Sequence, residues 1–167
     1  LRRSDLALIA EIKRASPSKG SINRGIDPVA QAKAYASGGA AAVSVLTESE
    51  SFGGSIDDLR LVAAAVAIPT LKKDFNVDEL QLLEARANGA SAALLIARAL
   101  PAHRFKELAN FARAIGLEIL AEVRDLRELE TAIDALCEII GVNNRNLETL
   151  NIEAGTADTI IPRIPAE

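Results

Sequence analysis

The sequence predicts an α/β protein of the (β/α)8 TIM-barrel type, with about six of the eight βα units present. Apolar runs of strand length alternate with segments of helical spacing along the whole chain. Most runs lack a regular apolar–polar alternation, as expected of parallel strands that are buried on both faces. No linker, low-complexity stretch or charge block divides them. We therefore expect residues 1–167 to form a single domain, a partial barrel that contains units one to six and lacks units seven and eight.

The strands are predicted from apolar runs that have the length of a strand. In chain order they cover Ala7–Lys13, Ala41–Thr47, Ile68–Phe75, Ala92–Ala97, Glu118–Val123 and Glu138–Asn143.

The helices are predicted from their spacing and from the residues at their ends. Asp27 is placed to cap the first, Pro28–Ser37, and Gly38-Gly39 stops it. The second precedes Pro69, glycines end the third and fourth, Asp125 introduces the fifth, and the sixth lies before two late prolines. These five cover Ile56–Val66, Val77–Asn88, Pro101–Ile115, Leu126–Leu136 and Ile152–Ile161.

An open, doubly wound sheet is the alternative architecture for six βα units. Polar residues gather where the predicted strands end, and a barrel would bring such positions to one mouth, whereas an open sheet would spread them along a line. No glycine-rich dinucleotide fingerprint follows the first strand. Both observations favour the barrel.

Composition restricts the function classes. The hydrophobic fraction of 49% is that of a globular chain, and a net charge of −4 without a basic tail argues against nucleic-acid binding. No apolar run approaches the roughly 18 residues that span a membrane. Cys137 is the single cysteine, which favours a reducing cytoplasm, and no His/Cys/Asp cluster has metal-ligand spacing. His103 is expected at the surface. The absence of methionine leads us to expect a segment of a longer protein.

The stretch "LIAEIKRASPSKG" places Glu11 and Lys13 on the same side at the end of an apolar strand. These two residues either form an ion pair that closes the end of the barrel or are functional groups of an active site. In "IPTLKKDF", Lys72 and Lys73 point to opposite sides, so one faces inward unless both extend into solvent. An inward lysine could serve as a general acid.

Further polar residues end the later strands. Glu122 lies in the apolar run "EILAEV", where a carboxylate is a base, an acid or a salt-bridge partner. Asn143 and Arg145 share parity in "GVNNRN", and the planar Arg145 fork suits an anionic substrate. The loop "SPSKG" offers hydroxyls, a cation and a hinge glycine that could fold over an anion.

Together these stretches resemble the indole-3-glycerol phosphate synthase family of tryptophan biosynthesis. The matching segments are "IAEIKRASPSKG", "VSVLTESESFGGS", "PTLKKDFNVDELQLLEARANGASAALLI", "LAEVRD" and "IIGVNNRNLETL", in the family's order. The resemblance implies a cytoplasmic carboxy-lyase with a barrel fold. It would close the indole ring of a phosphorylated substrate, 1-(2-carboxyphenylamino)-1-deoxyribulose 5-phosphate, with loss of carbon dioxide and water and without metal or organic cofactor.

The resemblance also implies roles for individual residues. Lys73 would protonate the substrate carbonyl oxygen, and Glu122 would handle protons and stabilise the positive charge that develops on nitrogen. Glu11 and Lys13 would complete the charged network, with Lys13 assisting dehydration. The substrate-binding residues would be Ser16, Phe75, Asn143 and Arg145.

The chain departs from the family pattern in three places. Little precedes the first strand, the seventh and eighth units are absent, and Leu136-Cys137 replaces a Gly-Ala pair before the sixth strand. Cys137 is expected to be a packing residue. A second hypothesis is therefore an inactive barrel fragment that folds by self-association through its unpaired edge strands. Another phosphate-binding barrel, such as phosphoribosylanthranilate isomerase, is a third, against which "KKDF" and "EIKRASPS" speak.

Overall fold

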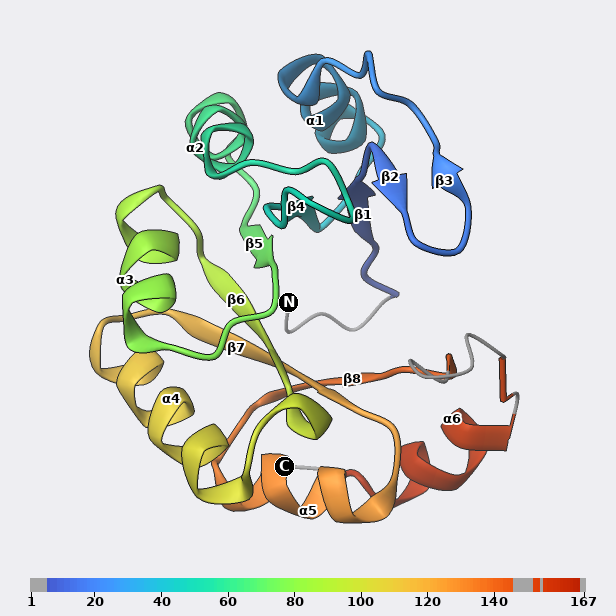
Figure 1. Cartoon of the computed structure of the whole chain (residues 1–167), viewed down its shortest axis with the longest axis vertical. Coiled ribbons are helices and arrows are strands. Elements are labelled where there is room, and N and C mark those ends of the chain that lie inside the picture. The colour runs from blue at the N-terminus through green and yellow to red at the C-terminus, as the bar shows by residue number, and fades with distance from the viewer. Residues whose placement is uncertain (1–5, 146–151, 154, 166–167) are drawn as a thin grey trace. The chain divides into compact units, whose positions relative to one another are not determined.

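Strands and helices alternate along the chain, and the strands of the main sheet follow one another in sequence order (Figure 1). The structure is a computed structural model and describes residues 6–145, 152–153 and 155–165. It divides into two units, one made of Leu1–Asp74 and Leu80–Ala93, the other of Phe75–Glu79 and Leu94–Glu167. The expectation of a single domain over residues 1–167 is not tested by this division and stays a prediction.

The first unit contains three complete parallel strands and the beginning of a fourth. The strands are β1 (Ile9–Ile12), β4 (Ala42–Leu46), β5 (Thr70–Lys73) and the first residues of β6 (Ala92–Ile96). Helix α1 (Pro28–Ser37) contacts β1 and β4, and α2 (Ile56–Ala65) contacts β4 and β5. Most of α3 (Glu79–Ala87) belongs to this unit as well.

The second unit continues the pattern from the end of β6 through β7 (Glu118–Val123) and β8 (Ile139–Val142). Helices α4 (Ala102–Ala114) and α5 (Leu126–Asp134) contact β7, and α6 (Gly155–Ile160) contacts β8. Two short 3-10 helices, η1 (Ala97–Ala99) and η2 (Ile161–Arg163), complete the unit.

Strand order decides between the two architectures that the sequence left open. The order β1-β4-β5-β6-β7-β8 follows the chain without reversal. The neighbours β1 and β4, β4 and β5, β5 and β6, and β7 and β8 pair in parallel. A doubly wound sheet reverses its order at a switch point, whereas a barrel of βα units does not. The βα-barrel class predicted from the sequence is therefore confirmed.

Burial differs between the strands. All five residues of β4 are buried, as expected of a strand covered on both faces. In β1 half-buried and buried positions alternate, and in β7 buried positions alternate with exposed or half-buried ones. In β7 the buried residues Ile119, Ala121 and Val123 belong to the core, and Glu122 lies on the other, more open side. This open side of the strands is where polar groups can be held without full desolvation.

Capping residues set several helix ends where the sequence predicts them. Asp27 accepts hydrogen bonds from the N–H groups of Val29 and Ala30 at 2.9 and 3.1 Å, and α1 covers the predicted range. The sixth predicted helix is shorter than expected, Gly155–Ile160, and continues as η2. Two strands that the sequence did not reveal lie at the two ends of the "SPSKG" loop, β2 (Ala15–Ser16) and β3 (Gly20–Ser21), and they pair antiparallel.

Candidate active site

A cluster of three charged side chains lies at the carboxyl ends of β1 and β5 in the first unit. The Glu11 carboxylate accepts a hydrogen bond from Lys13 Nζ and, at 2.9 Å, one from Lys73 Nζ. The side chains of Glu11, Lys13 and Lys73 are 27%, 31% and 33% exposed, so they are partly desolvated but open to a ligand. We refer to these residues as the β1–β5 charge cluster.

Opposing effects set the pKa of Glu11. Burial raises the pKa of this carboxyl, but the hydrogen bond from Lys13 and the charge of Lys73 together lower it more, so that the pKa lies below its usual value. Glu11 is therefore a stable anion between two ammonium groups near neutral pH. The cluster contains two cations and one anion and can accept an additional negative charge from a ligand.

The strand register explains how residues 62 positions apart meet. Glu11 pairs with Ser44 on β4, and Ser44 pairs with Leu71 on β5, so these residues share one side of the sheet. Lys73 follows Leu71 on that same side, two residues nearer the carboxyl end. Ser44 is buried and small, which leaves room for the Lys73 side chain to reach Glu11 across β4.

Lys72 occupies the opposite side of β5 and is 1% exposed. Its ammonium group lies 3.3 Å from a Glu84 carboxylate oxygen on α3. The alternative in which both lysines extend into solvent is therefore excluded. Lys73 is the lysine of this pair that binds the Glu11 carboxylate.

Contacts that the sequence did not predict bind the start of the first loop to the segment between β4 and α2 and to α2 itself. The N–H of Ala15 donates to the carbonyl of Phe52 at 3.1 Å, and the Arg14 guanidinium binds the Asp58 carboxylate at the start of α2. Ser16 lies in β2 and is half-buried, and its Oγ accepts the N–H of Lys19 at 3.3 Å. Arg14 was overlooked because Asp58 lies 44 residues away and no local pattern joins them.

A second polar group lies at the ends of β7 and β8, within the second unit. Asn143 Nδ2 donates to the Glu122 carboxylate at 2.9 Å, and Asn143 Oδ1 accepts the N–H of Arg145 at 2.9 Å. The backbone N–H of Asn143 donates to the Val123 carbonyl at 3.0 Å, which extends the β7–β8 pairing. These contacts orient Glu122 by a neutral amide. We refer to Glu122, Asn143 and Arg145 as the β7–β8 polar group.

Phe75 follows Lys73 by two residues and is 48% exposed, so its ring is accessible to a ligand. It belongs to the second unit, whereas Lys73 belongs to the first. The convergence of all the strand-end residues on one mouth stays a prediction of the sequence, as do their individual roles.

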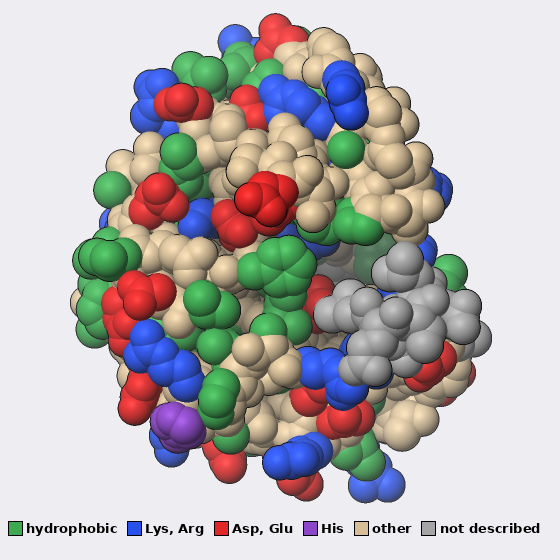
Figure 2. All heavy atoms as spheres, in the orientation of Figure 1, with side chains coloured by type: hydrophobic (Ala, Val, Ile, Leu, Met, Phe, Trp, Pro, Cys, Tyr) green, Lys and Arg blue, Asp and Glu red, His purple; other side chains and the backbone are tan. Residues whose placement is uncertain are grey.

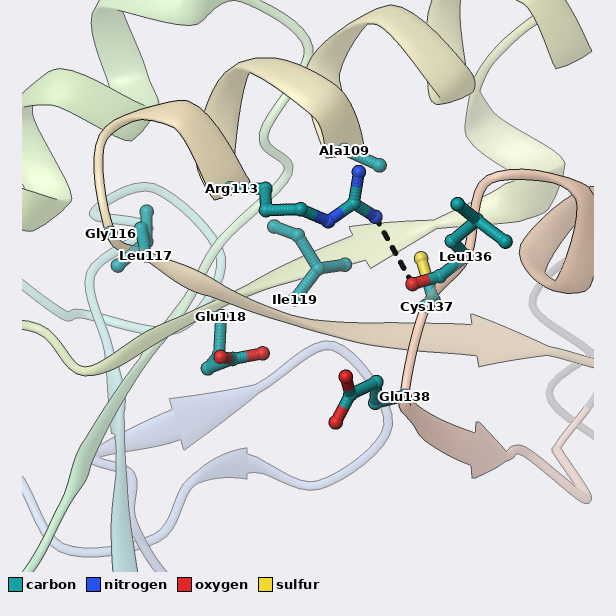
Figure 3. Close-up of a pocket in the computed structure, with 9 residues that line it drawn as sticks. All are labelled: Ala109, Arg113, Gly116, Leu117, Glu118, Ile119, Leu136, Cys137 and Glu138. Carbon is teal, nitrogen blue, oxygen red and sulfur yellow. Dashed lines mark hydrogen bonds between the residues drawn. The ribbon is translucent and has the colours of Figure 1, made fainter. Parts of the chain in front are cut away.

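A cavity of about 110 Å³ lies at the opposite, amino ends of β7 and β8 (Figure 3). The Arg113 guanidinium donates there to the carbonyls of Ala135 and Leu136 at 2.9 and 3.1 Å. Burial raises the pKa of the Cys137 thiol to about 11, so the thiol stays protonated near neutral pH. Residues at the amino ends of barrel strands serve stability rather than chemistry. Cys137 is thus a packing residue, as expected.

Three further observations concern the described residues only. His103 is exposed, as expected, and acidic and basic side chains are interspersed over the face that Figure 2 shows. Among these residues no group of three or more His, Cys, Asp or Glu side chains is arranged to hold a metal ion. No helix within the described part of the chain is long and apolar enough to cross a bilayer.

Sequential parallel βα units with charged groups at the strand ends define the class of TIM-barrel-type proteins. The chain belongs within that class to the indole-3-glycerol phosphate synthase family, whose sequence profile matches residues 1–167.

The chain is 50% identical over 161 residues to an indole-3-glycerol phosphate synthase from Oceanobacillus iheyensis, with 96% of this chain and 62% of the relative covered. It is 49% identical over 166 residues to indole-3-glycerol phosphate synthase 1 from Streptomyces coelicolor, with 99% of this chain and 62% of the relative covered. The chain thus spans about three fifths of the length of these curated relatives.

Solved structures of low sequence identity share the fold. A monomeric form of the dimeric phosphoribosylanthranilate isomerase from Thermotoga maritima superposes with a TM-score of 0.55 at 15% identity, covering 81% of this chain and 65% of that one. A 3-hexulose-6-phosphate synthase gives a TM-score of 0.63 at 10% identity, covering 87% of this chain and 72% of that one. At such identities these likenesses establish the fold alone.

Proposed function

We propose that this chain carries catalytic machinery of an indole-3-glycerol phosphate synthase. The reaction is the ring closure of 1-(2-carboxyphenylamino)-1-deoxyribulose 5-phosphate to indole-3-glycerol phosphate, with release of carbon dioxide and water. The observation that carries the proposal is the β1–β5 charge cluster, in which Glu11 holds the Lys73 ammonium group at a strand end. Family membership over residues 1–167 supports the same assignment.

Lys73 is the general acid of this proposal. A new carbon–carbon bond forms when the aromatic ring carbon that bears the carboxylate attacks the carbonyl carbon, and the carbonyl oxygen gains negative charge. An ammonium group that Glu11 fixes at 2.9 Å can donate a proton to that oxygen. Lys13, bound to the same carboxylate, would assist the later loss of the hydroxyl group as water.

Glu122 is the complementary anion. Electron density leaves the substrate nitrogen as the ring closes, so that a positive charge develops there before carbon dioxide departs. A carboxylate oriented by the Asn143 amide can stabilise this charge and accept the proton that restores aromaticity. An amide partner orients Glu122 without cancelling its charge.

Four residues would bind the substrate. Phe75 would pack on its aromatic ring, Ser16 would contact it from the first loop, and Asn143 and Arg145 would hold its hydroxyl and charged groups. The substrate is a phosphorylated small molecule, and the proposed location is the cytoplasm.

The test is formation of indole-3-glycerol phosphate from this substrate by the protein at the full length that its gene encodes. Lys73→Met should reduce kcat by at least about a thousandfold, because the proton donor is lost, and should change substrate affinity little. Lys106→Met is the matched control, since it removes one exposed ammonium group from α4. Near-normal turnover of Lys73→Met would remove Lys73 from this role. No turnover by the unsubstituted protein would contradict the proposal itself.

Self-association is the alternative of a different class. β1 and β8 are the end strands of the sheet order in the described residues, and an end strand offers backbone groups to another chain. Sedimentation of the 167-residue chain over a range of concentrations would decide the point. A monomer at all concentrations would contradict this alternative, and a dimer that forms no indole-3-glycerol phosphate would favour it.

A further inference from the structure

Two adjacent lysines lie at the end of β5, and the fold determines which of them faces the Glu11 carboxylate. Lys72 and Lys73 point to opposite sides of the strand, and a one-residue slip in register would exchange them. Either lysine could then face the Glu11 carboxylate, but its Nζ would lie at a different height along the strand. A general acid is effective only when its proton lies within hydrogen-bond reach of the substrate.

Lys72 is the most deeply buried charged side chain of the described residues, with 1% exposure. Its ammonium group lies 3.3 Å from a Glu84 carboxylate oxygen, 3.8 Å from an Asp74 carboxylate oxygen and 3.3 Å from the carbonyl oxygen of Gln81, to which it donates. An ammonium group without such partners would be costly to bury. Two carboxylates and a helix carbonyl therefore form a binding site for the Lys72 ammonium group on this side of β5.

The binding site of the Lys72 ammonium group is connected to the backbone that carries Lys73. The Asp74 carboxylate oxygen near Lys72 also accepts a hydrogen bond from Thr47 Oγ1 at 2.6 Å. The N–H of Thr47 donates to the carbonyl of Lys73 at 3.1 Å. Lys72, Asp74 and Thr47 thus form a chain of contacts that joins α3, the end of β5 and the end of β4.

We propose that Lys72 is a positioning residue, whose insertion between β5 and α3 fixes the register and direction of the strand end so that Lys73 reaches Glu11. The inference rests on the proposed role of Lys73 as general acid. It assigns Lys72 no contact with substrate. Its contribution is to make one of two nearly equivalent lysine placements the stable one.

The variant that tests this role is Lys72→Met, which keeps the length of the side chain and removes its charge. We expect kcat to fall about tenfold with KM nearly unchanged, because a displaced acid affects the transition state more than binding. We also expect the pKa of Glu11 to rise, measured from the carbon-13 shift of its carboxyl, because Lys73 is held less closely. Lys72→Arg should recover most of both properties, since Glu84 is 49% exposed and leaves space for the longer cation.

Two comparisons keep the test decisive. Glu84→Gln removes one of the two negative charges that bind Lys72, so it should shift kcat and the Glu11 titration in the same direction by smaller amounts. This variant tests the inference even if Lys72→Met does not fold. Lys106→Met should leave both measurements unchanged.

The outcomes separate this inference from the proposed function. A lower melting temperature for Lys72→Met with unchanged Glu11 titration and kcat would overturn the inference, because it would show a purely structural role. A shifted Glu11 titration in a protein that forms no indole-3-glycerol phosphate would support the positioning of Lys73 and contradict the proposed function. Unchanged titration and unchanged kcat in both Lys72→Met and Glu84→Gln would reject positioning while leaving the proposed function intact.

Discussion

Leu136 occupies a backbone conformation that glycine normally takes. Its φ angle is 57°, and it is the single non-glycine residue with positive φ in the described part of the chain. The N–H of Leu136 donates to the Ile133 carbonyl at 2.8 Å, and that of Cys137 to the Ala132 carbonyl at 3.0 Å. These two bonds form a Schellman motif at the end of α5, with Leu136 at the position after the cap where glycine is preferred.

The energetic consequence can be estimated from two terms. A left-handed conformation costs a residue with a Cβ atom about 1 to 2 kcal/mol, and glycine at that position would avoid this cost. Glycine in turn loses about 0.5 to 1 kcal/mol through the greater freedom of the unfolded chain. The Leu136 side chain is 71% exposed, so its packing contributes little. Leu136→Gly should therefore be more stable than Leu136→Ala by about 0.5 to 1 kcal/mol.

The assay is thermal unfolding of both variants, followed by circular dichroism. For a protein of this size the expected difference is about 1 to 4 °C in Tm, with Leu136→Gly the higher. Glu130 provides the matched control, because it is an exposed position inside the same helix. There Glu130→Gly should be less stable than Glu130→Ala by about 1 kcal/mol. If glycine is the less stable substitution at both positions, backbone strain at Leu136 is refuted.

Glu11, Cys137 and Gly54 each give a further testable outcome. The stability difference between the unsubstituted chain and Glu11→Gln, measured by urea unfolding, should shrink as pH falls, because a carboxyl whose pKa folding lowers stabilises only above that pKa. Iodoacetamide should alkylate Cys137 at about pH 8 roughly a hundredfold more slowly in the folded chain than in urea, since burial raises the thiol pKa from 9.0 to about 11. Equal rates would contradict that burial. Gly54→Ala should cost at least about 2 kcal/mol, because its Cβ would lie 2.2 Å from the Leu46 carbonyl oxygen.

Local signals predicted most of the fold. The range of α1 was correct because a capping aspartate and a proline mark its start and two glycines mark its end. The range of β7 was correct because its apolar run has sharp polar limits. The pair β2–β3 escaped prediction because each strand has only two residues, too few to show any periodicity.

The site could be predicted only in part from the sequence. Parity along β1 placed Glu11 and Lys13 on one side, and their contact confirms this. Parity along β5 could not say whether Lys72 or Lys73 faces Glu11. The choice is made by Glu84 and the Gln81 carbonyl on α3, and no pattern within the strand contains that information.

The two polar clusters differ in electrostatic character, and this difference is what the proposed chemistry needs. In the β1–β5 charge cluster one carboxylate is shared by two ammonium groups, so the balance is cationic although the whole chain has a net charge of −4. In the β7–β8 polar group the Glu122 carboxylate is held by a neutral amide, so its negative charge is oriented and remains in place. Ring closure requires a cation where a carbonyl oxygen becomes an alkoxide and an anion where nitrogen becomes cationic. If Lys13 and Lys73 were both exchanged for neutral residues, the Glu11 carboxylate would lose both of its ammonium partners. The proposed proton donors for the carbonyl oxygen and for the leaving hydroxyl group would then be absent.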